Sequence, residues 1–167
     1  MSSVAARELP TTALLAAYQR EGVYTDCFAV TVAGHVDFTN YVEAFYTTPL
    51  FKIERWLLGL FGYATSDQDA RRLALGEVSR FSVWQVEARQ PDQIMLNDKS
   101  GNTRSWFMIE TKRGDTTLYF GSAVVPAEGR SRIGIGYRAL TGFHCLYSRA
   151  LLDAAANRLP SARAGDD

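Results

Sequence analysis

The sequence predicts an α+β fold in which consecutive antiparallel strands pack against one long helix near the end of the chain. From Ser79 to Pro126, four segments rich in β-branched and aromatic residues alternate with turn residues. From Tyr137 to Leu159, apolar residues recur instead at the three- and four-residue spacing of a helix. At 167 residues and 47% hydrophobic content, the chain is long enough to bury one core without disulfide or metal support.

The first part of the chain predicts an arm, a strand and then a helix. Residues 1–23 are expected to form the arm, with a short helix from Thr12 to Arg20. Alternation of side chains from Tyr24 to Val32 predicts the first strand. After Asp37, a residue type that caps helices, the period becomes helical and predicts a helix that ends near Thr47.

Two more helices are expected before the strand-rich half. Pro49 suits the first turn of a helix that stops before Gly62. Its apolar residues repeat at helical spacing and predict one apolar face, made of Ile53, Trp56, Leu57, Leu60 and Phe61. The segment from Ser66 to Leu75, followed by Gly76, predicts a short capped helix.

The second half predicts four strands at residues 81–87, 93–96, 105–109 and 117–125, which makes five with the first strand. Turn residues at 89–92, 97–102 and 112–115 predict an antiparallel meander. The last helix should pack on this sheet through one stripe, composed of Leu140, Phe143, His144, Tyr147, Leu151, Ala155 and Leu159. We therefore expect a single domain over residues 24–159, with a flexible tail at 160–167.

Composition and cysteine pattern argue against several classes of protein and binding partner. With 18 basic and 18 acidic residues, the chain has no charge bias toward nucleic acid. Cys27 and Cys145 show no paired spacing, so neither a disulfide framework nor a metal site is expected, and no pattern calls for a cofactor. No window approaches the roughly 20 apolar residues that span a bilayer, and the N-terminus fits a secretory signal poorly. A cytoplasmic protein without integral membrane association is the default expectation.

Two sets of residues carry a resemblance to known proteins. The order of one strand, inserted helices, an antiparallel sheet and a long last helix resembles the helix-grip fold of the START-related (SRPBCC) superfamily. Phe81, Trp84, Val86 and Glu87, with the strand of Trp106 and the segments 119–126 and 142–147, resemble the bacterial family called domain of unknown function 2867. The resemblance implies a cavity between a concave sheet and the last helix that holds largely apolar molecules, and it implies no particular reaction. Five strands are fewer than such a sheet usually has, which predicts a smaller or open cavity.

The candidate ligand-binding residues follow from that cavity. Apolar contact is expected from Trp84, Trp106, Met108 and Tyr119, and polar orientation from Arg104, His144 and Tyr147. Period-two alternation places Arg104, Trp106 and Met108 on one strand face. An arginine beside an aromatic ring suits a carboxylate or phosphate, although a structural ion pair of Arg104 with Glu110 or Asp98 is the commoner explanation.

Three hypotheses about function remain open at this stage. The leading one is the binding of a small, mostly apolar or amphipathic molecule with an acidic group near Arg104. The second is a cyclase, aromatase or hydrolase that uses His144 as acid or base in the same cavity. The third is a structural protein with a filled core, forming a homodimer through Trp56 or the arm. A thiol nucleophile at Cys27 would need His144 nearby, and the sequence does not place them together.

Overall fold

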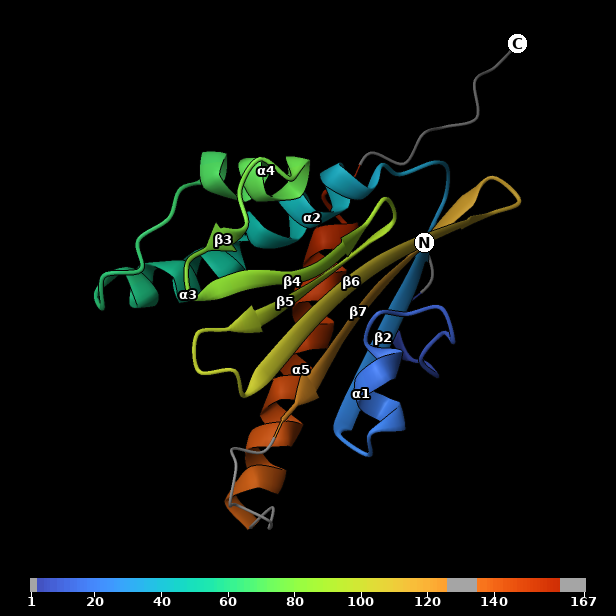
Figure 1. Cartoon of the computed structure of the whole chain (residues 1–167). Coiled ribbons are helices and arrows are strands. Elements are labelled where there is room, and N and C mark those ends of the chain that lie inside the picture. Colours follow the sequence, from blue (N-terminus) through green and yellow to red (C-terminus); the bar gives the residue numbers. More distant parts are fainter. Residues whose placement is uncertain (1–2, 126–134, 160–167) are drawn as a thin grey trace.

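The computed structural model describes residues 3–125 and 135–159, and within 135–144 it describes the backbone only. Its centre is a curved antiparallel sheet of seven strands in the order β1-β2-β7-β6-β5-β4-β3 (Figure 1). The strands are β1 (Ala5–Ala6), β2 (Tyr24–Val32), β3 (Arg80–Phe81), β4 (Trp84–Gln90), β5 (Gln93–Asp98), β6 (Thr103–Lys112) and β7 (Asp115–Val124). The helices are α1 (Ala16–Arg20), α2 (Phe38–Tyr46), α3 (Pro49–Gly59), α4 (Asp67–Leu75) and α5 (Ile135–Ala156). The predicted α+β class is confirmed.

The sheet has two strands more than the sequence predicts, and both are short. Ala5 and Ala6 of the arm pair with β2 and extend the sheet at that edge. At the other edge, the expected single strand over residues 81–87 is wrong, because the chain reverses between Phe81 and Trp84, which pair with each other. Ser82 adopts a positive φ of 55° in this two-residue turn. The turn has neither the Gly nor the Asn that usually signals such a reversal.

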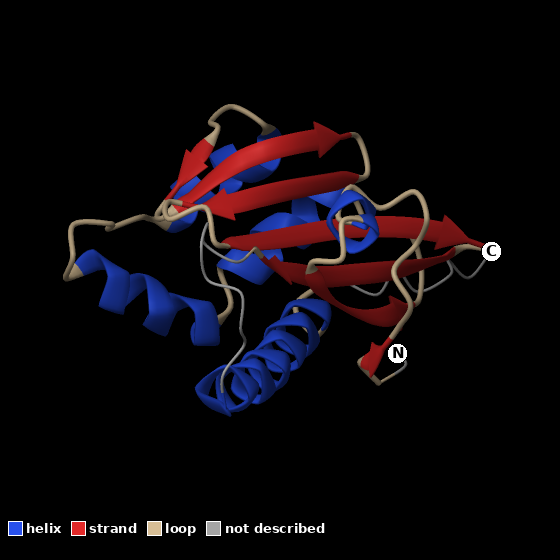
Figure 2. Cartoon of the chain, turned by 60° about the horizontal axis from the view of Figure 1, so that its bottom comes forward, coloured by secondary structure: helices blue, strands red, loops and turns tan. Residues whose placement is uncertain are grey.

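The two faces of the sheet are covered by different parts of the chain (Figures 1 and 2). Helices α2, α4 and α5 cover one face, and the arm with α1 covers the other. The larger core lies on the helix-covered face and includes Phe28, Val30, Ile94, Leu96, Phe107, Leu118 and Phe120. The smaller core lies under the arm and includes Leu15, Cys27, Met95, Trp106 and Met108. Successive side chains of one strand therefore belong to two separate cores.

A β-bulge in β4 changes which face its residues reach. The register with β5 shifts between Val86 and Ala88, so Glu87 is the additional residue. Trp84 and Val86 pack on the helix-covered core, whereas Ala88 packs under the arm. Arg89 then returns to the first face, where its guanidinium donates to the carbonyls of Leu73 and Ala74 at the C-terminus of α4.

Local signals set the start of α3 and both ends of α4 as predicted, whereas α3 ends at Gly59, earlier than the expected exit at Gly62. Pro49 begins α3, and the Thr48 hydroxyl accepts from the Phe51 amide at 3.2 Å. Ser66 and Asp69 form a reciprocal capping box at the start of α4, and Gly76 ends that helix with a φ of 80°. Asp37 occupies the cap position of α2, yet it makes no side-chain capping bond to the helix among the described residues.

Helix α3 faces the opposite way from its hydrophobic pattern. The five apolar side chains expected to form its packing face are exposed instead. Ile53 is 60%, Trp56 65% and Leu57 48% exposed within α3, and Leu60 and Phe61, just beyond its C-terminal end, are 67% and 78% exposed. Its buried face carries Arg55, which donates to Asp67 Oδ1 at 2.8 Å and to the carbonyl of Thr65 at 2.7 Å. This charged anchor to the start of α4 fixes the rotation of α3, because a buried guanidinium needs its partners.

Helix α5 crosses the sheet and contacts β2, β7, α2 and α3. Of its predicted stripe, Leu151 and Ala155 are buried and Tyr147 is half-buried. The side chains of Leu140, Phe143 and His144 lie outside the described residues, as does the expected tail at 160–167. In the part of the chain that the structure describes, no helix is both long enough and apolar enough to traverse a bilayer.

Candidate binding pocket

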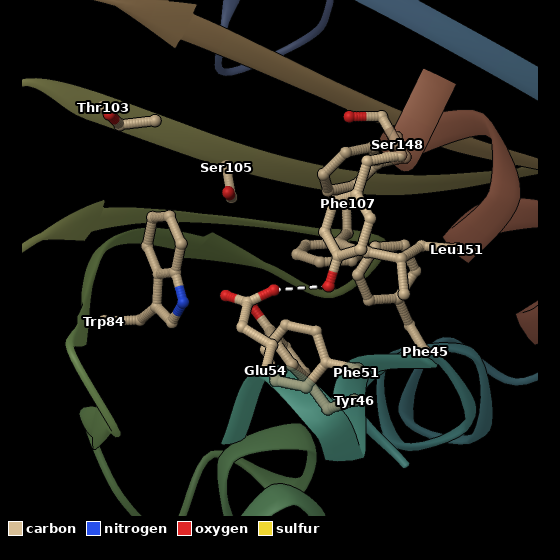
Figure 3. Close-up of a pocket in the computed structure, with 12 residues that line it drawn as sticks. Phe45, Tyr46, Phe51, Glu54, Trp84, Thr103, Ser105, Phe107, Ser148 and Leu151 are labelled. Atoms are coloured by element: carbon tan, nitrogen blue, oxygen red, sulfur yellow. Dashed lines mark hydrogen bonds between the residues drawn. The ribbon is translucent and has the colours of Figure 1, made fainter. Parts of the chain in front are cut away.

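A cavity of about 200 Å³ lies between the helix-covered face of the sheet and three helices (Figure 3). Helices α2 and α3 contribute Phe45, Tyr46, Phe51 and Glu54, and α5 contributes Tyr147, Ser148 and Leu151. The sheet contributes Trp84 from β4, Thr103, Ser105 and Phe107 from β6, and Phe120 from β7. The sheet therefore bounds the cavity on one side, and helices α2, α3 and α5 bound it on the other.

Aromatic rings form most of the wall. Phe45 lies 4.7 Å from Phe107 and 4.8 Å from Phe120, measured between ring centroids. Tyr46 meets Phe51 at 4.9 Å in an edge-to-face contact. Such contacts hold each ring in place, because stacked and edge-to-face pairs are favoured geometries. The apolar part of the pocket is thus preformed.

A tyrosine–glutamate pair bridges α5 and α3 at the pocket. Tyr147 Oη donates to Glu54 Oε2 at 2.5 Å. Burial raises the pKa of the Tyr147 phenol well above its usual range, and the hydrogen bond to Glu54 raises it further. A tyrosine phenol is protonated at neutral pH even with its ordinary pKa, and this shift keeps it protonated at alkaline pH as well, so Tyr147 is the donor and Glu54 the acceptor.

Two buried polar atoms of the pocket have no hydrogen-bond partner among the described residues. They are Oγ of Ser148, a residue that is 1% exposed, and Nε1 of Trp84. A buried polar group without a partner typically costs about 1–3 kcal/mol. Trp106 provides the contrast, because its Nε1 donates to Gln93 Oε1 at 2.9 Å. Unpaired polar groups around an apolar cavity indicate positions where a bound molecule would supply the missing partner.

The structure divides the predicted site residues between the two sheet faces. Trp84 and Tyr147 line the pocket. Trp106, Met108 and Tyr119 pack under the arm instead, and Arg104 points to the same side. Residues 103, 105 and 107 of β6 face the pocket, so the even-numbered residues of that strand cannot. Contact of those four residues with a ligand stays a prediction and receives no support from this pocket.

Arg104 has structural partners that the sequence did not indicate. Its Nε lies 2.6 Å from Glu87 Oε2 and donates to Tyr18 Oη at 2.9 Å. The guanidinium also lies over the Tyr18 ring, 5.0 Å from its centroid, and donates to the carbonyl of Gly101. The sequence therefore predicted an ion pair of Arg104 correctly in kind but with the wrong acid. The partner is Glu87, which follows Val86 on β4 and so lies on the arm side of the sheet.

His144 and the thiols do not form a described catalytic group. The His144 side chain lies outside the described residues, so its role as acid or base stays a prediction. Burial raises the pKa of the Cys27 thiol to about 12, with a further contribution from Asp26. Such a thiol is not a nucleophile at neutral pH. Within the described ranges, no group of three or more His, Cys, Asp or Glu side chains is placed to hold a metal ion.

Sequence reasoning missed Glu54 and Ser148 as pocket residues. Glu54 lies within the helix whose apolar stripe suggested a different rotation, and Ser148 follows Tyr147 in a helix that the apolar pattern alone defined. A usable signal existed for α3, since Phe51, Glu54 and Arg55 share one helical face at three- and four-residue spacing.

Comparisons with known proteins assign no family. No family model and no curated protein matches the sequence. Among solved structures, the chain is similar to the crystal structure of protein Ms6760 from Mycobacterium smegmatis, with 9% identity and a TM-score of 0.46. The similarity covers 95% of this chain and 99% of that one. This distant likeness supports no argument about function, and the resemblance to domain of unknown function 2867 and to the START-related superfamily is not confirmed.

Proposed function

We propose that the protein binds a small, mostly apolar molecule in the pocket between the sheet and helices α2, α3 and α5, in a fold of the helix-grip type. The observation that carries the proposal is the Ser148 hydroxyl, which is buried at the wall of an aromatic cavity without a partner among the described residues. A ligand that fills the cavity and supplies a partner to an unpaired polar atom of its wall, Ser148 Oγ or Trp84 Nε1, would gain from both interactions.

The cavity volume limits the size of the ligand. A cavity of about 150 Å³ lined by apolar side chains can hold benzene, and this one measures about 200 Å³. A single substituted ring or a short aliphatic chain therefore fits. Drug-sized molecules need roughly 300 Å³ or more, so the lipids and polyketides that the resemblance suggests are too large for this pocket as it stands.

Native mass spectrometry of the protein purified from its own host tests the proposal. We expect a stoichiometric adduct of low mass that is released on denaturation. Ser148→Met should fill the cavity and abolish the adduct, whereas Leu146→Met, on the exposed side of the same helix, should retain it. A clean apo mass, together with no uptake from a metabolite extract, would favour a purely structural role.

A second candidate function is self-association through the outward stripe of α3. Its five exposed side chains offer on the order of 600 Å², close to the roughly 800 Å² per partner of a standard interface. All five side chains of the stripe are uncharged, and the two cations of the same helix, Lys52 and Arg55, both pair with Asp67 rather than standing within the stripe. A second copy is the occupant that fits, since an uncharged apolar stripe is complementary to itself. A helix that binds membranes would instead present basic residues beside its apolar face.

Sedimentation velocity over a range of concentrations tests this candidate. Leu60 and Leu146 are each 67% exposed, but only Leu60 belongs to the stripe. We expect a dimer that Leu60→Lys converts to a monomer and that Leu146→Lys leaves intact. A monomer for the unaltered chain at every concentration would exclude self-association through α3.

A further inference from the structure

The polar end of the pocket combines a donor with an acceptor. Trp84 and Glu54 approach from β4 and α3, and Figure 3 shows the indole nitrogen edge and the carboxylate turned toward one another. The indole N–H can only donate, and an ionised carboxylate can only accept. Trp84 Nε1 nevertheless makes no hydrogen bond within the described residues, so the two groups do not satisfy each other.

The chemistry of these two groups selects among the polar ends that a small ligand can carry. A carboxylate would accept from Trp84 but would be repelled by Glu54, and no Lys, Arg or His is among the described lining residues to offset its charge. An ammonium would pair with Glu54 but would leave the Trp84 N–H without an acceptor. A ketone or ether would accept from Trp84 and offer nothing to Glu54. A hydroxyl group can do both, because it accepts and donates at one oxygen.

We infer that the occupant of this pocket is an uncharged alcohol or phenol of single-ring size, whose hydroxyl oxygen accepts from Trp84 Nε1 and whose proton is donated to Glu54. The inference rests on the proposed function, since it names the ligand class of the same pocket. It also replaces the acidic ligand expected from the sequence, because Arg104 is bound to Glu87 on the other face of the sheet.

Tyr147 prepares the acceptor for this ligand. Its raised pKa keeps the phenol protonated, and its bond to Glu54 Oε2 fixes the carboxylate at the pocket wall. A carboxylate has about four lone-pair sites, so it can accept a ligand hydroxyl in addition to the phenol. The aromatic wall around Phe45, Phe107 and Phe120 then contacts the ring or alkyl body of the ligand.

Four probes that share one ring test the inference in solution: benzyl alcohol, toluene, benzoate and benzylamine. Binding is followed by the three indole N–H resonances of the protein, with that of Trp84 identified by its loss in Trp84→Phe. We expect benzyl alcohol to bind about tenfold more tightly than benzoate or benzylamine, the difference of one charge-assisted hydrogen bond. The Trp84 resonance should move downfield with benzyl alcohol and not with toluene.

Two matched variants test whether the preference for benzyl alcohol depends on Glu54. Glu54→Gln keeps the shape of the side chain and should weaken benzyl alcohol several-fold while improving benzoate, because the charge is removed. Glu110→Gln alters a second tyrosine–glutamate pair, formed with Tyr119 on the other face, and should change neither affinity. If Glu54→Gln fails to fold, the relative affinities of the four probes for the unaltered protein still test whether the ligand is an alcohol.

Different results would contradict the hydroxyl inference and the proposed ligand-binding function. Tighter binding of benzoate or benzylamine than of benzyl alcohol, or a Trp84 resonance that benzyl alcohol leaves in place, would overturn the hydroxyl inference and retain a ligand-binding pocket. Binding of none of the four probes would overturn both.

Discussion

Each face of the sheet packs against a tryptophan: Trp106 is fully buried under the arm, and Trp84 is partly buried at the pocket. Their indole N–H groups differ in whether they have a partner. Under the arm, Trp106 Nε1 donates to Gln93 Oε1, which also accepts from the Leu14 amide at 2.9 Å, and Gln93 Nε2 donates to the carbonyl of Thr12. In the pocket, Trp84 Nε1 has no partner among the described residues. The arm-covered face is thus closed by its own chain. The helix-covered face retains polar groups that a bound molecule can satisfy.

The first prediction separates the two tryptophans by stability. Trp106 is fully buried, so Trp106→Ala should lower the free energy of unfolding by about 3–5 kcal/mol. Trp84→Phe should lower it by about 1 kcal/mol or less, because the replaced N–H has no hydrogen bond to lose. Urea unfolding curves of both variants measure the difference. Equal losses would show that Trp84 is as structural as Trp106.

The second prediction tests how tightly the arm is packed. A Cβ added to Gly121 would lie 2.6 Å from the Asp26 carbonyl oxygen and 3.1 Å from both Leu15 and Trp106. Gly121→Ala should therefore cost about 1–3 kcal/mol of stability. Gly59→Ala is the control, since its nearest neighbour, Ala64, is 3.7 Å away and alanine favours a helix. A neutral Gly121→Ala in thermal unfolding would mean that the arm is loosely held.

The third prediction concerns pH and the same closed face. The Cys27 thiol has an ordinary pKa of 9.0, and burial raises its pKa to about 12 in the folded protein. Between these values the unfolded chain ionises first, so the contribution of the thiol is complete below pH 9 and is lost as the pH rises toward 12.

We expect a loss of roughly 1 kcal/mol per pH unit in that window from this group. Denaturant unfolding at several alkaline pH values should show a shallower decline for Cys27→Ala than for the unaltered protein. Cys145→Ala, which alters a half-exposed thiol on α5, is the control. Parallel declines for all three proteins would indicate that Cys27 ionises as easily in the folded state as in the unfolded one.

Sequence reasoning succeeded where the signal is local. Pro49, the capping residue Ser66 and the exit glycine Gly76 each act on their own backbone, and the helix ends lie where they predict. The hairpin at Arg113 and Gly114, both with positive φ, likewise follows from turn chemistry. These features depend on neighbours within a few residues.

The sequence could not predict which side chains of β6 face the helices and which face the arm. Its even-numbered residues include Trp106 and Met108, and its odd-numbered residues include Phe107 and Ile109, so both faces are apolar. This pattern arises because each face is covered, one by helices and the other by the arm. Alternation identifies a buried face only when the opposite face meets water.

The prediction of which face of α3 is buried failed for a different reason. Its outward stripe is the more apolar face, and the pairing of Arg55 with Asp67, beyond the end of the helix, together with the burial of Phe51, holds the other face inward. That partner lies in the next helix, so the hydrophobic pattern of α3 contains no trace of it. Glu54 reaches the pocket as a result of the same rotation.

The pairing of β2 with β7 has a consequence for how the chain acquires its structure. Tyr24 at the start of β2 lies opposite Val124 at the end of β7, and the helices α2 to α4 and four other strands intervene in the sequence. During synthesis β2 has no neighbour on its β7 side until nearly all the strands have been made. Pairing over such a sequence separation is slow, because a long loop must close before the contacts form. The sheet should thus complete itself late, in one cooperative step that joins the first long strand to the last.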